Sequence, residues 1–205
     1  MIAIVDYGRG NLGSVLKALG GLGMRAVITD DPRAVADAEA VVLPGDGAFH
    51  DAMATLERLG LLDPIRDCLA RERPFLGICL GYQLLFTESE EFGTGKGMDV
   101  IPGAVRRFPA GLKVPHMGWN SVEHRGDLRL FEGVPSGASF YFVHSYFPET
   151  SDPTVRVATC TYGVAFPAAV ERGMLFATQF HPEKSQRWGL RLLQNFAAIV
   201  RDHRR

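Results

Sequence analysis

The chain has 205 residues, of which 46% are hydrophobic and 22% charged, and its formal net charge is −1. These values predict one globular domain over residues 1–205, and the small net charge gives no electrostatic reason to expect nucleic acid or an anionic membrane as a partner. Three widely spaced cysteines, no CxxC or HExxH spacing, and no apolar run suited to a leader or a membrane span favour a cytoplasmic protein without a disulfide framework or a metal.

The first half of the chain alternates short apolar runs with helical patterns. We expect helices from residue 12, from residue 32 and over 49–59 and 62–71, and strands over 1–6, 24–29, 40–43 and 75–78. Such alternation predicts an α/β fold, with a mostly parallel sheet between helices and a site at the carboxyl ends of its strands. Gly8 and Gly10 suggest a dinucleotide loop, but GxGxxG is incomplete and no acid is placed to bind a ribose, so this interpretation is rejected.

The third strand runs into the loop Pro44-Gly45-Asp46-Gly47. A loop of this composition can direct free backbone N–H groups at a ligand, although an ordinary turn between strand and helix would read the same way.

The fourth strand ends at Cys79, which has a glycine two residues before it and another two residues after it. This is the arrangement of a nucleophile elbow, with cysteine in place of serine. Glycines at both positions permit the sharp turn, which pushes the sulfur out of the sheet and points the next helix at it. The backbone N–H of Leu80 then becomes available to an oxyanion. A buried structural cysteine in a strand-to-helix turn is the alternative.

The second half of the chain changes in character. Residues 87–102 are polar and glycine-rich, and we expect an exposed loop there. Short strands follow, at 105–108, 112–114, 140–147, 154–162, 164–171 and 174–180, which indicates an antiparallel region that joins or flanks the same sheet. The last helix, over 185–201, is expected to bury Leu190, Leu193, Phe196, Ala197 and Val200.

A candidate base for the cysteine lies at the end of the last strand, in His181-Pro182-Glu183. Proline fixes the local turn, so the histidine and the glutamate can both project toward the carboxyl end of the strand. Glu183 would accept a hydrogen bond from one imidazole nitrogen and set the tautomer of the other, as in a nucleophile–base–orienter triad. His144 is the competing base, ranked second because it has no adjacent acid.

These motifs, in this order, resemble the class I (triad) glutamine amidotransferase family. More narrowly, the chain is similar to the glutaminase subunits of imidazole glycerol phosphate synthases. The narrower resemblance depends on blocks spread over the chain: Asp6-Tyr7-Gly8-Arg9-Gly10-Asn11-Leu12, Pro115-His116-Met117-Gly118-Trp119-Asn120, Tyr141-Phe142-Val143-His144-Ser145-Tyr146 and Gln179-Phe180-His181-Pro182-Glu183-Lys184-Ser185. Asp46 departs from the family, which often has a small apolar residue there, and we expect its carboxylate to face outward.

The resemblance implies a role for each matching residue. The catalytic residues are Cys79, His181 and Glu183, and the oxyanion site comprises Gly45, Asp46, Gly47 and Leu80. Glutamine would be held by Gln83, His144, Ser145 and Tyr146. The contacts with a partner subunit would come from Asn11, Met117, Trp119, Asn120 and Lys184. No cofactor is implied.

The resemblance also implies a reaction: hydrolysis of glutamine, with the ammonia passed to a (β/α)₈ cyclase subunit in a heterodimer of histidine biosynthesis. A glutaminase serving another synthase is one alternative, against which the blocks at 115–120 and 141–146 argue. A scaffold or binding module that keeps the triad without using it is another. A free-standing cysteine hydrolase would have no reason to combine Gln83 with His-Pro-Glu.

Overall fold

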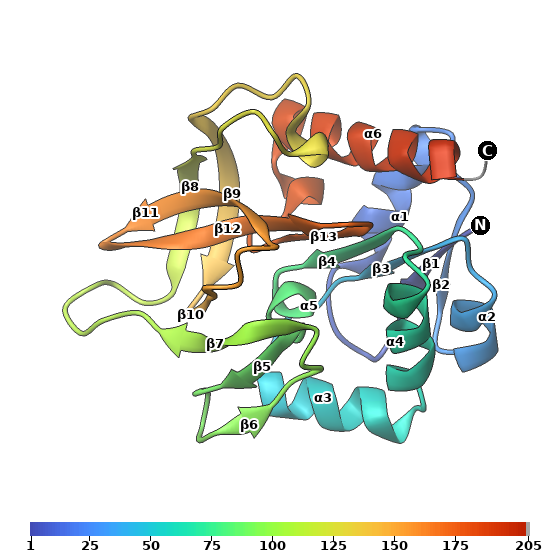
Figure 1. Cartoon of the computed structure of the whole chain (residues 1–205), viewed down its shortest axis with the longest axis horizontal. Helices are drawn as coiled ribbons and strands as arrows, with labels where there is room; N and C mark the ends of the chain where they lie inside the picture. The colour runs from blue at the N-terminus through green and yellow to red at the C-terminus, as the bar shows by residue number, and fades with distance from the viewer. Residues whose placement is uncertain (204–205) are drawn as a thin grey trace.

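A seven-stranded sheet organises the structure, a computed structural model that describes residues 1–203 (Figure 1). Its strand order is β11-β12-β13-β4-β3-β1-β2, and the five strands from β13 to β2 are parallel. The antiparallel strands β12 and β11 extend one edge. The strands are β1 (Ile2–Val5), β2 (Ala26–Thr29), β3 (Ala40–Leu43), β4 (Phe75–Ile78), β11 (Arg156–Tyr162), β12 (Val164–Arg172) and β13 (Leu175–Thr178). The predicted mixed, mostly parallel sheet is confirmed.

Helices cover both faces of this sheet, because successive side chains of its buried strands point to opposite sides. Ile2 and Ile4 pack with α1 (Leu12–Gly21) and α6 (Gln186–His203), whereas Ala3 and Val5 face α3 (Phe49–Arg58) and α4 (Leu62–Ala70). Figure 1 shows α6 above the sheet and α3 and α4 below it. The short helix α2 (Pro32–Ala36) begins as predicted, with Asp31 accepting from the Arg33 amide at 2.9 Å.

The expectation of an exposed loop over residues 87–102 is wrong. This segment contributes to a four-stranded sheet of order β10-β7-β5-β6, made of β5 (Phe86–Ser89), β6 (Gly95–Lys96), β7 (Ile101–Arg107) and β10 (Tyr146–Glu149). Two of its glycines permit close packing: a Cβ at Gly97 would overlap the carbonyl oxygen of Phe86, and one at Gly95 would overlap the His50 ring. Met98 and Ile101 are buried against the main sheet's helices and strands.

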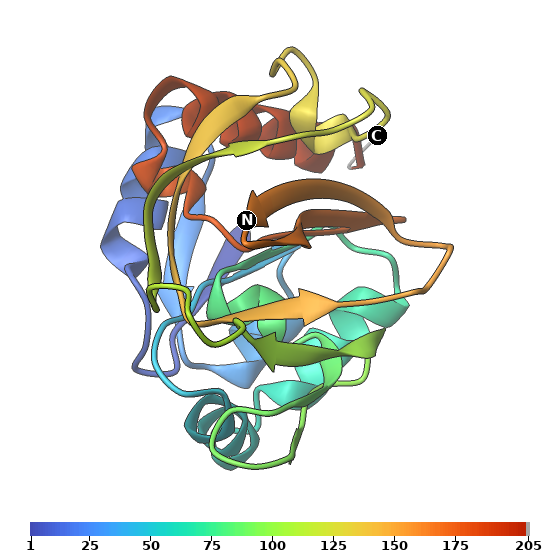
Figure 2. The same ribbon diagram turned by 90° about the vertical axis from the view of Figure 1, so that its left-hand side faces the viewer.

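The strand predicted over 140–147 is two strands in two sheets. β9 (Ala138–His144) pairs with β8 (His116–Val122), and after Ser145 the chain continues as β10, which pairs with β7. Figure 2 shows the β8–β9 pair curving beside the main sheet. The strand expected at 112–114 does not form, and β8 takes its place because alternate residues such as His116 and Val122 can be buried while Met117 faces outward.

Two short 3₁₀ turns, η1 (Arg129–Phe131) and η2 (Pro182–Lys184), complete the described elements. In α6 the buried residues are Gly189, Leu192, Leu193, Phe196, Ala197 and Val200. Leu190 is 43% exposed, so its expected burial is wrong: the buried stripe passes through Gly189 and Leu193 instead. No helix within residues 1–203 is both long enough and apolar enough to cross a bilayer.

Candidate active site

Strand register brings three loops together at the carboxyl edge of the central sheet. Thr178 of β13 pairs with Ile78 of β4, so the residues that follow them, Gln179 and Cys79, leave the sheet side by side. On the other side of β4, Leu43 pairs with Gly77, which places the loop after β3 beside the same corner. The parallel arrangement alone therefore accounts for the meeting of the predicted nucleophile, base and oxyanion loop.

Cys79 forms the predicted elbow between β4 and the short helix α5 (Leu80–Gln83). Its φ is +55°, a left-handed conformation that is uncommon outside glycine. A Cβ at Gly81 would lie well inside contact distance of the Leu43 carbonyl oxygen, and one at Gly77 would lie 3.0 Å from the Gly81 carbonyl oxygen. Both glycines are therefore required for close backbone approach.

His181 follows β13 and lies beside this elbow. Its Nδ1 atom is 2.8 Å from Glu183 Oε1, and both side chains are almost fully buried. Burial lowers the pKa of the imidazole, but the Cys79 sulfur and the Glu183 carboxylate outweigh burial and raise this pKa to about 10. The Nε2 atom makes no hydrogen bond of ordinary length within residues 1–203, although the sulfur is close enough to act on the ring. The group can act as a nucleophile with its base and orienter.

A pocket of about 400 Å³ opens over the sulfur. Its lining includes most of the residues expected to act on glutamine: Asp46, Gly47, Cys79, Leu80, Gln83, His144, Ser145, Tyr146 and His181. Asn11 and Lys184, expected at a partner interface, also line it. The structure thus brings the predicted nucleophile, base and substrate residues into one cavity, and Glu183 lies behind His181, outside its lining.

The expected oxyanion donor at Leu80 is occupied by the protein itself. Its amide donates to the Gly45 carbonyl oxygen at 3.4 Å, so the loop presents an acceptor where an oxyanion would need a donor. Asp46 is exposed, in agreement with the expectation that its carboxylate faces outward. In this arrangement the predicted oxyanion site is closed: the Leu80 amide is not free to bind an anion.

The glutamine-binding candidates have their hydrogen bonds largely committed. The Gln83 side-chain amide donates to the Tyr146 carbonyl oxygen at 2.9 Å and to Gln179 Oε1 at 3.0 Å, which leaves only its own carbonyl oxygen for a ligand. His144 is buried against His116, and we call these two residues the histidine pair. Burial lowers the pKa of His144 to about 3, so its ring stays neutral near pH 7.

Two of the three predicted interface residues on β8 lie on its outward face. Met117 is 62% exposed and Trp119 is 50% exposed, whereas Asn120 points inward and is half-buried. Two large apolar side chains in contact with solvent on one short strand are typical of a surface that another protein covers.

Sequence reasoning missed two polar residues beside the nucleophile. Glu91 lines the pocket and accepts from the Phe49 amide at 2.6 Å. It was not predicted because residues 87–102 were expected to form an exposed loop. Gln179 is fully buried, and its Nε2 donates to the Cys79 sulfur at 3.7 Å. The signal for Gln179 was a polar side chain at the end of an otherwise apolar strand.

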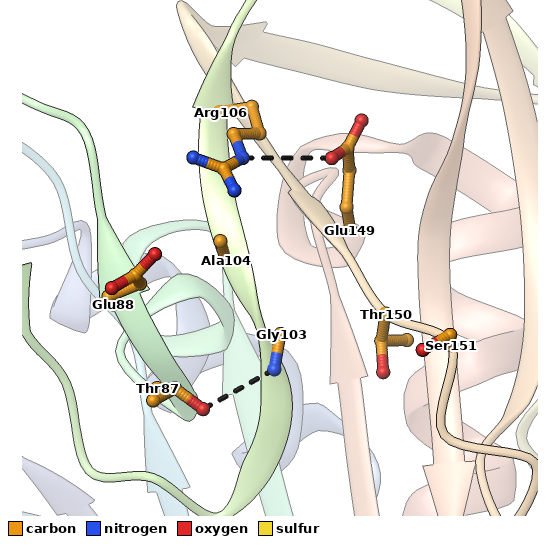
Figure 3. A pocket seen from close by; sticks show the side chains of 8 residues that line it. All are labelled: Thr87, Glu88, Gly103, Ala104, Arg106, Glu149, Thr150 and Ser151. Carbon is orange, nitrogen blue, oxygen red and sulfur yellow. Dashed lines mark hydrogen bonds and ion pairs between the residues drawn. The ribbon is translucent and has the colours of Figure 1, made fainter.

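A second hollow of about 530 Å³ lies between β5, β7 and β10, away from Cys79 (Figure 3). Its lining offers neither cysteine nor histidine, and its Arg106 is paired with Glu149 at 3.7 Å. Among residues 1–203 there is also no group of three or more His, Cys, Asp or Glu side chains placed to hold a metal ion.

Comparison with known proteins agrees with this geometry. The family model described as Glutamine amidotransferase class-I matches residues 3–200. The Imidazole glycerol phosphate synthase subunit HisH of Moorella thermoacetica is 54% identical over 200 residues, which cover 98% of this chain and 95% of the relative. The subunit of the same name from Geobacter sulfurreducens is 53% identical over 205 residues, covering 97% and 98%.

Solved structures share the fold at lower identity. A structure described as a glutamine amidotransferase aligns with a TM-score of 0.77 and 20% identity, covering 98% of this chain and 99% of the other. A chain in the structure of PurLQS from Thermotoga maritima aligns with a TM-score of 0.72 and 19% identity, covering 100% and 98%.

Proposed function

The chain belongs to the class-I glutamine amidotransferase family, and from this premise we infer that it is the glutaminase subunit of an imidazole glycerol phosphate synthase. One observation carries the chemistry: Cys79, His181 and Glu183 meet at the edge of the sheet, beneath a pocket that fits a small amino acid. The relatives that cover nearly the whole chain support the choice of synthase.

The reaction begins at the Cys79 sulfur, which attacks the side-chain amide carbon of glutamine as a thiolate. The amide oxygen becomes an oxyanion, and the tetrahedral intermediate collapses when protonated His181 gives its proton to the departing ammonia. His181 then takes a proton from water, whose oxygen attacks the thioester and releases glutamate. Glu183 keeps the imidazole oriented through both steps by accepting from Nδ1.

Hydrogen bonds within the protein already fix which of the groups proposed to hold glutamine can donate and which can accept. Both Gln83 amide hydrogens are committed, so the group that Gln83 has left for a ligand is its carbonyl oxygen, an acceptor that suits the ammonium or the amide hydrogens of glutamine. Ser145 and the backbone of residues 144–146 supply further polar groups on the same side of the pocket. We propose that these residues set the preference for glutamine.

The closed oxyanion site makes this glutaminase slow until the loop after β3 moves. Losing one oxyanion donor costs on the order of 10²–10³ in rate in comparable sites. Freeing the Leu80 amide from the Gly45 carbonyl restores a donor, and a rearranged loop adds N–H groups from residues 45–47. We propose that the partner subunit drives this change.

The proposed partner is a (β/α)₈ cyclase subunit that binds the exposed side of β8 and forms a heterodimer in the cytoplasm. Ammonia released at Cys79 passes to the cyclase, which closes the imidazole ring to give imidazole glycerol phosphate and an aminoimidazole carboxamide nucleotide. Met117 and Trp119 provide the apolar part of the contact surface, and Asn11 and Lys184 provide the polar part. Asn120 is left out of this surface, because its side chain is turned inward and donates to the Thr161 carbonyl oxygen. A single glutaminase domain is sufficient for this role.

The test is glutamine-dependent formation of imidazole glycerol phosphate by the chain, the cyclase subunit and its nucleotide substrate. The Cys79→Ala variant is expected to lose synthesis from glutamine but to retain synthesis from an added ammonium salt. Synthesis from ammonium alone by the wild-type complex, with none from glutamine, would contradict the proposal. Glutamine hydrolysis stimulated only by a different synthase would redirect it to that enzyme.

A further inference from the structure

A continuous set of hydrogen bonds leads away from the nucleophile. Gln179 Nε2 donates to the Cys79 sulfur at 3.7 Å, and Gln179 Oε1 accepts from Gln83 Nε2 at 3.0 Å. The same Gln83 nitrogen donates to the Tyr146 carbonyl oxygen at 2.9 Å. If the Gln179 amide were reversed, its nitrogen would meet the Gln83 nitrogen, donor against donor, and its oxygen would face the sulfur. Gln83 therefore fixes the donor that Cys79 receives.

The set continues through the histidine pair to strand β8. His144 Nδ1 lies 2.8 Å from the Tyr146 carbonyl oxygen, and His144 Nε2 lies 2.9 Å from His116 Nδ1. His116 Nε2 lies 3.2 Å from Asn120 Nδ2. Met117 and Trp119 on the same strand face outward, so the chain of hydrogen bonds joins the exposed strand to the nucleophile.

The direction of these hydrogen bonds is fixed from both ends. The Tyr146 carbonyl can only accept, so His144 carries its proton on Nδ1 and its Nε2 must accept. The Asn120 amide nitrogen can only donate, so His116 accepts at Nε2 and carries its proton on Nδ1. Both conditions lead to the same arrangement, in which His116 donates to His144.

The orientation of Asn120 is itself fixed by the backbone. Its Nδ2 donates to the Thr161 carbonyl oxygen at 3.0 Å, and its Oδ1 accepts from the Ser121 amide at 2.8 Å. The side chain therefore cannot turn over without losing both contacts.

Packing around the histidine pair excludes a charged form. The His116 ring lies between Tyr162, with centroids 4.2 Å apart, and Phe142, with centroids 4.8 Å apart. Burial lowers the pKa of His116 to about 4 and is the main cause that lowers that of His144. A second proton on either ring would also place donor against donor within the chain, so both rings stay neutral at pH 7.

Two runs of hydrogen bonds meet at the Tyr146 carbonyl oxygen, and together we call them the relay. Asn120 donates to His116, His116 to His144 and His144 to this oxygen, while Gln83, which also donates to Gln179, donates to it from the other side. We propose that Asn120 and His116 are positioning residues, which act on Gln83 through the carbonyl that His144 and Gln83 share, and that Gln179 sets the reactivity of Cys79 by direct contact with its sulfur. It deepens the proposed function: a partner that rearranges β8 would alter the nucleophile through these contacts, in addition to any movement of the oxyanion loop. None of the three residues takes part in bond making: Asn120 and His116 act through their neighbours, and Gln179 contacts the sulfur itself.

The first experiment uses the unmodified chain and records the side-chain ¹⁵N signals of its histidines by NMR at pH 7. Both members of the histidine pair are expected to be neutral and to carry the proton on Nδ1, the less common tautomer of free histidine. A proton on Nε2 of either ring, or an ordinary titration of either ring near pH 6.5, would overturn the relay.

The second experiment measures the alkylation rate of Cys79 by iodoacetamide, followed by mass spectrometry of the labelled peptide. Gln179→Leu is expected to slow alkylation about tenfold or more, because a hydrogen bond to a charged sulfur is lost. Asn120→Asp places a carboxylate oxygen opposite His116 Nε2, and this contact is a hydrogen bond only if Nε2 carries a proton. We therefore expect alkylation of Cys79 to be roughly two- to tenfold slower and the NMR spectrum to show a proton on His116 Nε2.

Matched variants separate the relay from general packing. His116→Phe keeps the ring between Phe142 and Tyr162 but removes both hydrogen bonds, and it is expected to slow alkylation several-fold. His116→Asn can place an amide nitrogen where Nδ1 was and is expected to recover part of the rate. His124→Phe is the control: this histidine also packs on an aromatic ring and contacts a carbonyl oxygen, but lies outside the relay, so the rate should stay unchanged.

Equal alkylation rates for wild type, Gln179→Leu and His116→Phe would refute the positioning role. The effects of Asn120→Asp and Gln179→Leu on the logarithm of the alkylation rate should not be additive in the double variant, because both changes act on the donor to the Cys79 sulfur. Additive effects would overturn the relay. These readouts need neither glutamine nor a partner, so they stand or fall separately from the proposed glutaminase activity.

Discussion

Replacing Glu183 with glutamine tests the triad while leaving the shape of the site almost unchanged. The carboxylate accepts from His181 Nδ1 at 2.8 Å in a buried position, and it helps to raise the pKa of the imidazole to about 10. Glu183→Gln removes the charge, so this pKa falls and the alkaline limit of activity moves to lower pH.

The size of the effect follows from the hydrogen bond that remains. If the glutamine oxygen still faces Nδ1, a charge-assisted bond becomes a neutral one, a loss of about 1–2 kcal/mol or roughly 5- to 30-fold in rate. If the amide nitrogen faces Nδ1 instead, the imidazole is held in the wrong tautomer, and losses on the order of 10⁴ are known for the equivalent change in a serine protease. We therefore expect a decrease of about tenfold or more.

The assay is glutamate release as a function of pH, with the partner subunit present. Glu57→Gln, on the exposed side of α3, is the control for the loss of one negative charge and should keep the wild-type profile. A Glu183→Gln variant with a rate within twofold of wild type and the same alkaline limit would refute the role of Glu183 as orienter.

Three further predictions follow. Cys79→Ala and His181→Ala should each abolish glutamate release while circular dichroism and partner binding stay normal; near-normal turnover would disprove the triad. Gly81→Ala should lower the free energy of unfolding by about 1–3 kcal/mol or more, because its methyl group meets the Leu43 carbonyl oxygen. Gly13→Ala, which has open space in α1, should not lower this free energy. The histidine pair, with pKa values of about 4 and about 3 in the fold against 6.5 unfolded, contributes stability above pH 6.5 that is lost as pH falls toward those values; denaturant titrations should show a steeper acid loss in wild type than in His116→Phe.

The central sheet was predictable because it obeys local rules. Apolar runs such as Ala40–Leu43 and Phe75–Ile78 are buried on both faces and end at glycine-rich turns, and parallel pairing then fixes where those turns meet. The candidate triad followed for the same reason, since Cys79 comes directly after such a strand and His181 comes three residues after the end of another. No tertiary information was needed to place them at one edge.

The small sheets were only partly predictable, because their strands depend on partners distant in sequence. The strands expected at 105–108 and 140–147 overlap β7, β9 and β10, whereas β5, β6 and β8 were not expected. β8 contains glycine, asparagine and histidine, and it is a strand only because β9 pairs with it. Ser145 carries no sequence signal that the chain leaves one sheet there and enters another. The occupied Leu80 amide likewise depends on the orientation of a single peptide group, which residue types do not determine.

The most direct test of the central claim is the rate of glutamate release from glutamine by this chain alone, with the cyclase subunit, and with the cyclase subunit and its nucleotide ligand. The closed oxyanion site predicts a slow rate alone and a steep rise, on the order of 10²-fold, when both are present. Equal and substantial rates in all three conditions would contradict partner gating and the assignment to this synthase.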